Sequence, residues 1–248
     1  MITCKTDSEI TLMRQAGRVV ALTLEELSKH LKPGITALEL DQMAADFIRS
    51  HDCIPTFEGQ YGFPKHICIS FNEEVVHGIP TARKLKEGDI IKLDIGATYK
   101  GWVGDAAKSF AVGKVSPQIQ KLLKVTEEAL MLGIAQMRLG NHLNDIATAI
   151  SSHAEGQGFS VVTDYGGHGI GRLNHEDPYV PHSRQKIRGM ALRKGMCLAI
   201  EPMINIGKAA VKVKSDKWTV VTTDGKLSAH FEHTAVVTNG EPQILTLI

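Results

Sequence analysis

Apolar residues recur at helical spacing in four stretches of this chain, with polar residues between them. This spacing predicts four amphipathic helices, over residues 7–31, 37–51, 119–137 and 143–156. Asp7 or Ser8 is the predicted cap of the first helix, because short polar side chains at this position accept hydrogen bonds from free backbone amides. The segment Lys32-Pro33-Gly34 ends that helix, and Gly140 separates the last two.

Shorter apolar runs lie between the two helix pairs and after the second pair. They predict strands over residues 53–57, 67–70 and 159–162, a further strand ending at 199–202, and a late hairpin of 218–222 with 228–237. The glycine-rich segments 60–64 and 166–171 are predicted to be loops. Helices that alternate with short strands predict an α/β chain of the α+β kind.

The stretch GDIIKLDIGATYKGWVGD, residues 88–105, places two acids in an apolar setting. Its turn near Tyr99-Lys100-Gly101 predicts a β-hairpin whose two strands bring Asp94 close to Asp105. Two carboxylates that face each other in an apolar environment repel, and a cation between them removes that cost. The alternative is a surface hairpin with two solvated acids.

Two sequence patterns occur twice at nearly the same offset. The turn over residues 34–39 matches residues 140–145, which lie 106 positions later, and the segment 85–94 matches residues 192–201, which lie 107 positions later. A period of this size is too long for a solenoid repeat. The matches therefore predict a duplicated unit, although the second pattern, Leu-basic-x-Gly before a strand, is also common in unrelated turns.

The predicted organisation is a single catalytic domain over residues 1–248, with half-repeats of approximately 8–113 and 114–248 packed about a pseudo-two-fold axis. Asp94 and Glu201 end the matched segments, so we expect them to face each other across that axis. A functional site is predicted where strands of the two halves meet.

Composition and charge narrow the class of protein. Of the 248 residues 43% are hydrophobic and 22% are charged, which is ordinary for a globular protein. The formal net charge of +1 favours neither nucleic acid nor an anionic membrane as a partner. The four cysteines are widely spaced without a CxxC motif, which favours reduced thiols in a cytoplasmic protein. The polar N-terminus does not resemble a signal peptide, and no apolar run is long enough to span a bilayer.

If the halves are related, each supplies two acids to the shared site, and one histidine from the GGHGIG segment joins them. The predicted metal ligands are Asp94, Asp105, His168, Glu201 and Glu232. Four carboxylates and an imidazole carry too much charge for one ion and suit two divalent transition-metal ions bridged by carboxylates.

His77 and His175 remain without a role in that ligand set. Each is either a hydrogen-bonded turn histidine or an imidazole that lines the cleft as a proton donor to substrate. Motifs for other chemistries do not occur: GGHGIG lacks the GxGxxG spacing, and the chain has no P-loop, no HExxH and no GxSxG.

Five segments are recognisable together: CISFNEEVVHGIP, DIIKLDIGATYKGWVGDAAKSF, GGHGIGRLNHEDP, AIEPMI and HFEHTAVV. In order and spacing they resemble the signature segments of type I methionine aminopeptidases, over nearly the whole chain from about Lys5. The resemblance implies the duplicated pita-bread fold, with an antiparallel sheet around a central dinuclear metal site.

The resemblance also implies roles for individual residues. It gives the five residues named above as ligands of two metal ions, which are Co, Mn, Fe or Zn. His77 and His175 become the substrate-contacting catalytic histidines, and Glu201 also handles the proton of the attacking water. The methionine pocket is implied to contain Phe63, Cys68 and Trp218.

Two positions depart from the family pattern and put the pocket wall in question. Phe57 stands where some members have a pocket cysteine, and Asn174 stands where some have phenylalanine. The chain has no zinc-binding N-terminal extension, as in the short bacterial form. The thirty residues between Glu201 and Glu232 leave no room for the helical insertion of type II members.

The implied function is removal of the initiator methionine from nascent polypeptides when the second residue is small. The expected partners are N-termini of nascent chains and the ribosome, for a cytoplasmic monomer without membrane or direct nucleic-acid contacts. Two rivals remain. One is an Xaa-Pro peptidase of the aminopeptidase P or prolidase kind, which usually carries an extra N-terminal domain, and the other is a non-catalytic pita-bread binding protein.

Overall fold

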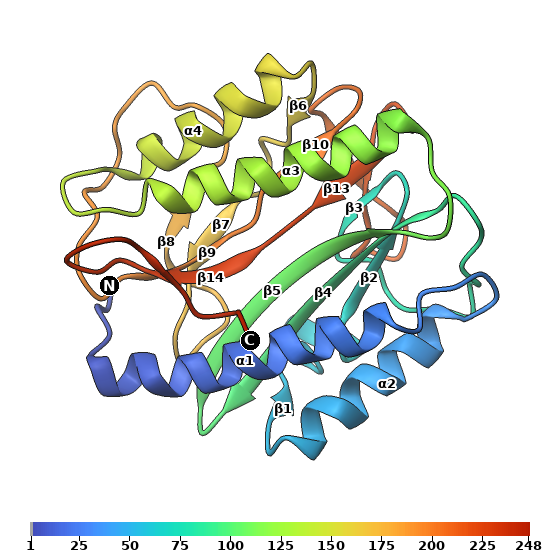
Figure 1. Ribbon diagram of the computed structural model, residues 1–248, viewed down its shortest axis with the longest axis horizontal. Helices are drawn as coiled ribbons and strands as arrows, with labels where there is room; N and C mark the ends of the chain where they lie inside the picture. Colours follow the sequence, from blue (N-terminus) through green and yellow to red (C-terminus); the bar gives the residue numbers. More distant parts are fainter. Residues whose placement is uncertain (1) are drawn as a thin grey trace.

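The computed structural model describes residues 2–248 as strands held between two pairs of helices. In Figure 1 the first helix pair lies along one side of the strands and the second pair along the opposite side. The four helices are α1 (Asp7–Ser28), α2 (Ala37–Ser50), α3 (Pro117–Ala135) and α4 (Leu143–Gly156). None of the helices in residues 2–248 is long and apolar enough to cross a membrane.

The helices lie where apolar periodicity predicts them, and their caps explain their boundaries. Thr6 caps α1 and Thr36 caps α2, each in a capping box with a glutamate three residues later. The predicted cap of α1, Asp7 or Ser8, is therefore wrong: Asp7 is already helical, and the hydroxyl of Thr6 accepts the bond from Glu9 N. The helix also ends at Ser28, before the predicted end.

The strands form four small sheets. The first sheet contains β1 (Ile54–Pro55), β2 (Cys68–Phe71), β4 (Ile90–Tyr99) and β5 (Trp102–Ala111), and the second contains β6 (Ser160–Val161), β10 (Met203–Asn205) and β13 (Ser228–His230). The third contains β3 (Glu74–Val76), β11 (Val211–Val213) and β12 (Val220–Thr222), and the fourth contains β7 (Gly167–Gly169), β8 (Glu176–Val180), β9 (Cys197–Ile200), β14 (His233–Val236) and β15 (Gln243–Ile244). The short turn η1 spans Gln60–Gly62.

The predicted hairpin of residues 88–105 is confirmed as β4 and β5. Lys100 and Gly101 both have positive φ, 48° and 77°, which is the geometry of a tight hairpin turn. Asp94 pairs with Ala107, and Asp105 pairs with Gly96. Residues two apart on a strand point to the same face, so both acids project from one face of the hairpin.

Two sequence predictions are wrong in the later part of the chain. The late hairpin does not form: β12 pairs with β11 and β3, whereas residues 228–237 divide into β13 and β14 in two different sheets. Part of the predicted glycine-rich loop is the strand β7, which pairs with both β8 and β9. A Cβ on Gly167 would meet the carbonyl oxygen of Ala199, so the absent side chain lets the strands approach.

Each predicted half contains an equivalent hydrogen bond, and the two bonds are related by the offset of the sequence repeat. Leu85 N donates to Ile35 O at 2.8 Å, and Leu192 N donates to Asn141 O at 2.8 Å. Helix α4 begins 106 residues after α2, as Leu143 follows Ala37. This recurrence is what a duplicated unit requires, and the half boundaries stay a prediction.

A buried lysine joins segments of the two predicted halves. Lys92 on β4 is 1% exposed, and its Nζ donates to Asn72 O at 2.7 Å and to Ser228 O at 3.1 Å. Because a buried ammonium group needs acceptors, these bonds keep β4 against β13. They also fix the strand that carries Asp94.

Candidate metal centre and substrate cleft

A cavity of about 310 Å³ lies where the β4–β5 hairpin faces β7 and β9. All ten residues predicted for the site line it, and so do four others, Phe57, Gln60, Tyr61 and Asn174. The ten are His77, Asp94, Asp105, His168, His175, Glu201, Glu232, Phe63, Cys68 and Trp218. The structure thus brings together residues that lie up to 175 positions apart in the chain, as Phe57 and Glu232 do.

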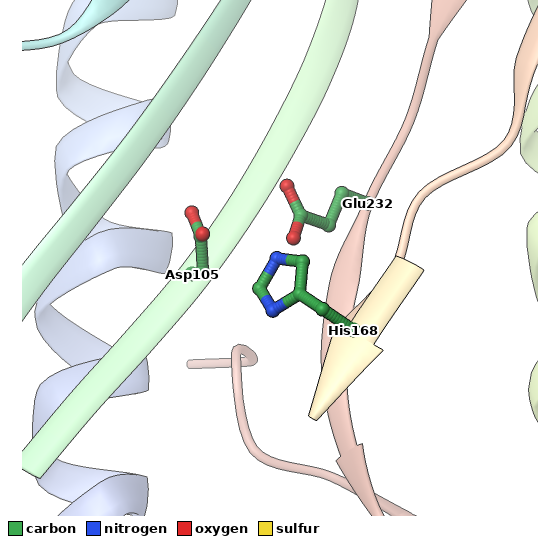
Figure 2. Close-up of side chains that lie close together, drawn as sticks. All are labelled: Asp105, His168 and Glu232. Atoms are coloured by element: carbon green, nitrogen blue, oxygen red, sulfur yellow. The ribbon is translucent and has the colours of Figure 1, made fainter. Parts of the chain in front are cut away.

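Three of the predicted ligands form a compact group. Asp105, His168 and Glu232 each offer one ligand atom, and these atoms lie within 4.8 Å of one another. Figure 2 shows the three side chains pointing toward one another from β5, from β7 and from the segment between β13 and β14. All three residues are buried.

Asp94 on β4 and Glu201, just after β9, complete the set from two different sheets. Asp94 projects from the same face of the hairpin as Asp105. Glu201 follows directly after β9, and its Oε1 lies 3.5 Å from His168 Nε2. Both acids line the cavity, so its inner wall carries four carboxylates and one imidazole.

Burial gives these groups unusual proton affinities in the absence of a cation. It raises the pKa of Asp94, Glu201 and Glu232 well above their ordinary values, and the neighbouring carboxylates raise them further. The pKa of Asp105 rises to about 7, because burial outweighs the hydrogen bonds from Asn174 and Ala106 N. Burial lowers the pKa of His168 to about 3, so its imidazole is neutral and has a lone pair for a ligand.

The donor set fits divalent metal ions. Among the described residues, Asp105 Oδ1 and Glu232 Oε1 are buried without a hydrogen-bond partner. Buried carboxylate oxygens without partners are costly, and a cation satisfies them. Oxygen ligands with one imidazole suit the divalent transition metals of hydrolytic two-metal sites.

An apolar pocket adjoins the carboxylates. Phe57, Phe63 and Cys68 form one buried cluster, and Trp218 packs against it. The rings of Phe63 and Trp218 meet edge to face with centroids 5.1 Å apart. Phe57, noted above as a departure from the family pattern, therefore adds an aromatic wall to this pocket.

The two remaining histidines also line the cavity. The ring centroids of His175 and His168 lie 4.3 Å apart, and Gln60 Nε2 lies 3.3 Å from Nδ1 of His175. His77 has a φ of 58° and packs edge to face against Tyr165, with ring centroids 5.8 Å apart. Burial lowers the pKa of His77 to about 4, which leaves a neutral ring with one N–H to donate.

Sequence reasoning missed three contributions to the site. Asn174 was noted only as a pocket departure, yet its Nδ2 donates to Asp105 Oδ2 at 2.9 Å. His182 and His230 were not considered, and both flank Glu201. One signal was present for His230, because it precedes Glu232 by two positions, the side-chain period of an extended strand.

Known proteins similar in sequence to this chain include a metallopeptidase family and individual aminopeptidases. The pattern of metallopeptidase family M24 matches residues 11–239. Methionine aminopeptidase 1 of Bacillus subtilis (strain 168) is 52% identical over 248 residues and covers 100% of both chains.

Solved structures extend the similarity to the fold. The crystal structure of methionine aminopeptidase from Rickettsia prowazekii has a TM-score of 0.98 and 43% identity, and that from Thermotoga maritima has 0.98 and 44%; both comparisons cover 100% of each chain. The shared fold is the pita-bread fold implied by the sequence motifs. An Xaa-Pro dipeptidase from Bacillus anthracis shares the fold at a TM-score of 0.76, but with 22% identity, over 98% of this chain and 61% of the other.

The family pattern spans most of the chain, and the similarity to relatives extends from end to end. The carboxylate and histidine side chains of this chain line one cavity of the fold that these relatives have. The chain therefore belongs to metallopeptidase family M24.

Proposed function

We propose that this protein removes the initiator methionine from nascent proteins and peptides when the second residue is small. The observation that carries the proposal is one cavity in which four carboxylates and an imidazole adjoin an apolar cluster of aromatic side chains and a cysteine. The relatives named methionine aminopeptidase support it, since they match the chain over its full length.

The cofactors that we propose are two divalent transition-metal ions, Co, Mn, Fe or Zn. Their ligands would be Asp94, Asp105, His168, Glu201 and Glu232. When bound, such ions lower the pKa of a water molecule and polarise a carbonyl group. Four carboxylates give the site enough negative charge for two ions.

The remaining steps fall to side chains of the chain itself. Glu201 accepts the proton of the attacking water and delivers it to the leaving amine, since it lies at the edge of the donor set beside His168. His175 donates to the carbonyl oxygen of the scissile bond, and His77 contacts the scissile amide. Both rings line the same cavity as Glu201, which permits these contacts.

The pocket walls account for the proposed specificity. Phe63, Cys68 and Trp218 are an apolar surface for an unbranched, flexible thioether, and Phe57 narrows it further. The second residue of the substrate lies beside His77 and His175, and a packed wall excludes large side chains there.

Cellular setting belongs to the proposal as well. All four cysteines, which lie within the described residues, are free thiols, as a reducing cytoplasm requires. We propose a cytoplasmic monomer that acts on N-termini of nascent chains as they leave the ribosome. Co-sedimentation with ribosomes and analytical ultracentrifugation test these two points separately.

The rival functions have less support. Xaa-Pro peptidases share only the fold with this chain, at 22% identity for the Bacillus anthracis enzyme. A non-catalytic relative typically loses ligands, whereas all five donors are present here and line one cavity.

The test compares four tripeptides, Met-Ala-Ser, Met-Lys-Ser, Leu-Ala-Ser and Ala-Pro-Ser, with one metal at saturating concentration. We expect Met-Ala-Ser to be cleaved about a hundredfold faster than the others in kcat/KM, because a packed wall excludes more steeply than a lost contact. Faster cleavage of Ala-Pro-Ser would identify a proline-specific enzyme. Metal binding without cleavage of any peptide would identify a binding protein.

A further inference from the structure

Glu201 is surrounded by histidines, and two of them are not metal-ligand candidates. His182 Nε2 accepts the backbone N–H of Glu201 at 3.3 Å. His230 Nε2 lies 3.6 Å from Glu201 Oε2, while His168 Nε2 lies 3.5 Å from Glu201 Oε1. Each carboxylate oxygen therefore faces a different imidazole.

The ring of His230 has no other partner among the described residues. It is 1% exposed, and both of its nitrogens are buried without a hydrogen bond. In either protonation state an imidazole carries at least one N–H, and a buried N–H without an acceptor costs about 1–3 kcal/mol. Glu201 Oε2 is an acceptor that lies just beyond hydrogen-bonding distance of this ring, 3.6 Å from its Nε2.

The backbone of His230 is held too firmly for the ring to be incidental. Ser109 Oγ donates to His230 O at 2.7 Å and accepts from His230 N at 2.9 Å. His230 also pairs with Met203 in the β10–β13 ladder. With the main chain fixed on two sides, the ring keeps its place beside Glu201.

We propose that His230 is a positioning residue that donates its Nε2–H to Glu201 Oε2 and thereby fixes the orientation of the Glu201 carboxylate. This inference rests on the proton-transfer role proposed above for Glu201. The present 3.6 Å separation shortens to a hydrogen bond with a small rotation of the glutamate, as contacts in catalytic sites do when they are loaded.

The consequence is a division of labour between the two oxygens. With Oε2 held by His230, Oε1 is the oxygen that faces His168 and the donor set. A carboxylate held in this way meets the water proton in one geometry, whereas a free one samples several rotamers. Mutation of a residue that hydrogen-bonds to a metal ligand typically lowers activity or metal affinity by about 10–100-fold.

The first experiment determines the tautomer in the Zn²⁺-loaded wild-type protein, in which bound ions keep the carboxylates ionised, by ¹⁵N NMR of the histidine side chains. The His230 signals are assigned by their loss in His230→Gln. We expect a hydrogen on Nε2. A hydrogen on Nδ1 with a bare Nε2 would overturn the proposal, whatever the activity of the protein.

The second experiment separates a positioning role from a structural one. His230→Leu replaces the imidazole with an apolar side chain of similar volume and removes the donor, whereas His230→Gln keeps an N–H at a similar reach. For Met-Ala-Ser we expect kcat to fall about tenfold or more in His230→Leu, with KM within about threefold, and to recover most of the loss in His230→Gln. The cobalt absorption spectrum should change in His230→Leu and return in His230→Gln.

Controls keep the outcomes distinct. His153→Leu removes a histidine that pairs with Glu128 at 3.0 Å on the α3–α4 surface, and it should leave kcat and the cobalt spectrum unchanged. Equal kcat and equal spectra for wild type and His230→Leu would refute the positioning role. If His230→Leu does not fold, the NMR tautomer and His230→Gln decide. If wild type cleaves no peptide, the proposed function fails, and the tautomer still tests the contact.

Discussion

Glu201 has the most demanding of the roles proposed for the individual residues of the site. It lies between His168 and His230, and burial together with Asp94 and Asp105 raises the pKa of its carboxyl group. A group with raised proton affinity is suited to accept a proton and return it within one catalytic cycle. Its two neighbours hold it in place for that transfer.

Glu201→Gln should therefore impair turnover more than affinity. The amide keeps an oxygen for a metal ion but does not accept the proton of water, so kcat should fall about a hundredfold or more while KM changes by less than about fivefold. Steady-state kinetics with Met-Ala-Ser measure both constants, and metal content is checked by mass spectrometry. A kcat within a few-fold of wild type would show that another group takes the proton.

Alkylation of Cys68 tests whether this residue lines the proposed methionine pocket. It is 5% exposed, and burial followed by the charge of Asp94 raises the pKa of its thiol, so little thiolate forms at neutral pH. We expect iodoacetamide to modify exposed Cys4 first and Cys68 slowly, and we expect free methionine to slow only the reaction of Cys68. Mass spectrometry of tryptic peptides measures both rates. Modification of Cys68 at the same rate with and without methionine would remove it from the pocket wall.

Among the structural elements, the turn between β7 and β8 carries Asn174 and His175 into the site. Glu176 holds this turn: its Oε1 accepts from Arg172 N at 2.8 Å, and its Oε2 accepts from Lys5 Nζ at 2.7 Å. Lys5 is 7% exposed, so the N-terminal segment is tied to the turn by a largely buried ion pair. The position of His175 thus depends on contacts outside the cavity.

The pH dependence of this contact has a definite sign. Burial alone would raise the pKa of Glu176, but the bonds from Lys5 and from the backbone of Leu173 and Arg172 lower it below its ordinary value of 4.5. A folded-state pKa below the unfolded-state value stabilises the protein above that unfolded value, and the stabilisation is lost as pH falls through the folded-state pKa.

We therefore expect Glu176→Gln to lower the free energy of unfolding by about 2 kcal/mol at pH 7, because one partner of a buried ion pair is lost. The difference from wild type should shrink below about pH 4.5, where the unfolded wild-type chain is protonated at this position. Urea titrations at several pH values measure it, and Lys5→Met with the double variant completes a cycle. A difference that grows as pH falls would contradict the assigned sign.

Elements set by local sequence patterns were predicted correctly, whereas elements set by distant strand pairing were not. Long helices such as α3 are predictable because their apolar period repeats many times, and the β4–β5 hairpin is predictable from its local turn. The late hairpin was wrong because pairing of β13 with β10 and of β14 with β9 is decided by distant strands. The strand β7 looked like a loop, since glycine has low strand propensity and its value here is close packing.

The candidate site shows the same division. The acids were found because the repeat and the family motifs placed them at matching positions. The contacts of Asn174 with Asp105, and of His230 with Glu201, join segments 69 and 29 residues apart that no local pattern relates. Such partners become visible only when the chain has been folded.

At the scale of the whole molecule, the cleft joins the two predicted halves and holds four carboxylates in a buried space. Asp94 and Asp105 come from the hairpin, whereas Glu201 follows β9 and Glu232 lies between β13 and β14 in the later part of the chain. Repulsion among these groups opposes closure of the two parts around the cavity. Metal ions held by these four acids would relieve that repulsion, and their binding energy would add to folding stability.

Removal of metal should therefore lower the unfolding temperature of the entire chain. A ligand at 100 times its Kd stabilises the folded state by about 2.7 kcal/mol, which for a chain of this length corresponds to about 5–10 °C. Calorimetry of wild type in Mn²⁺ and in excess chelator measures the difference. Asp94→Asn is the matched control: it should unfold at a higher temperature than wild type in chelator, because one repelling carboxylate is gone, and should gain little from Mn²⁺. Equal unfolding temperatures of wild type with metal and with chelator would mean that the cavity does not hold the ions on which the proposed function depends.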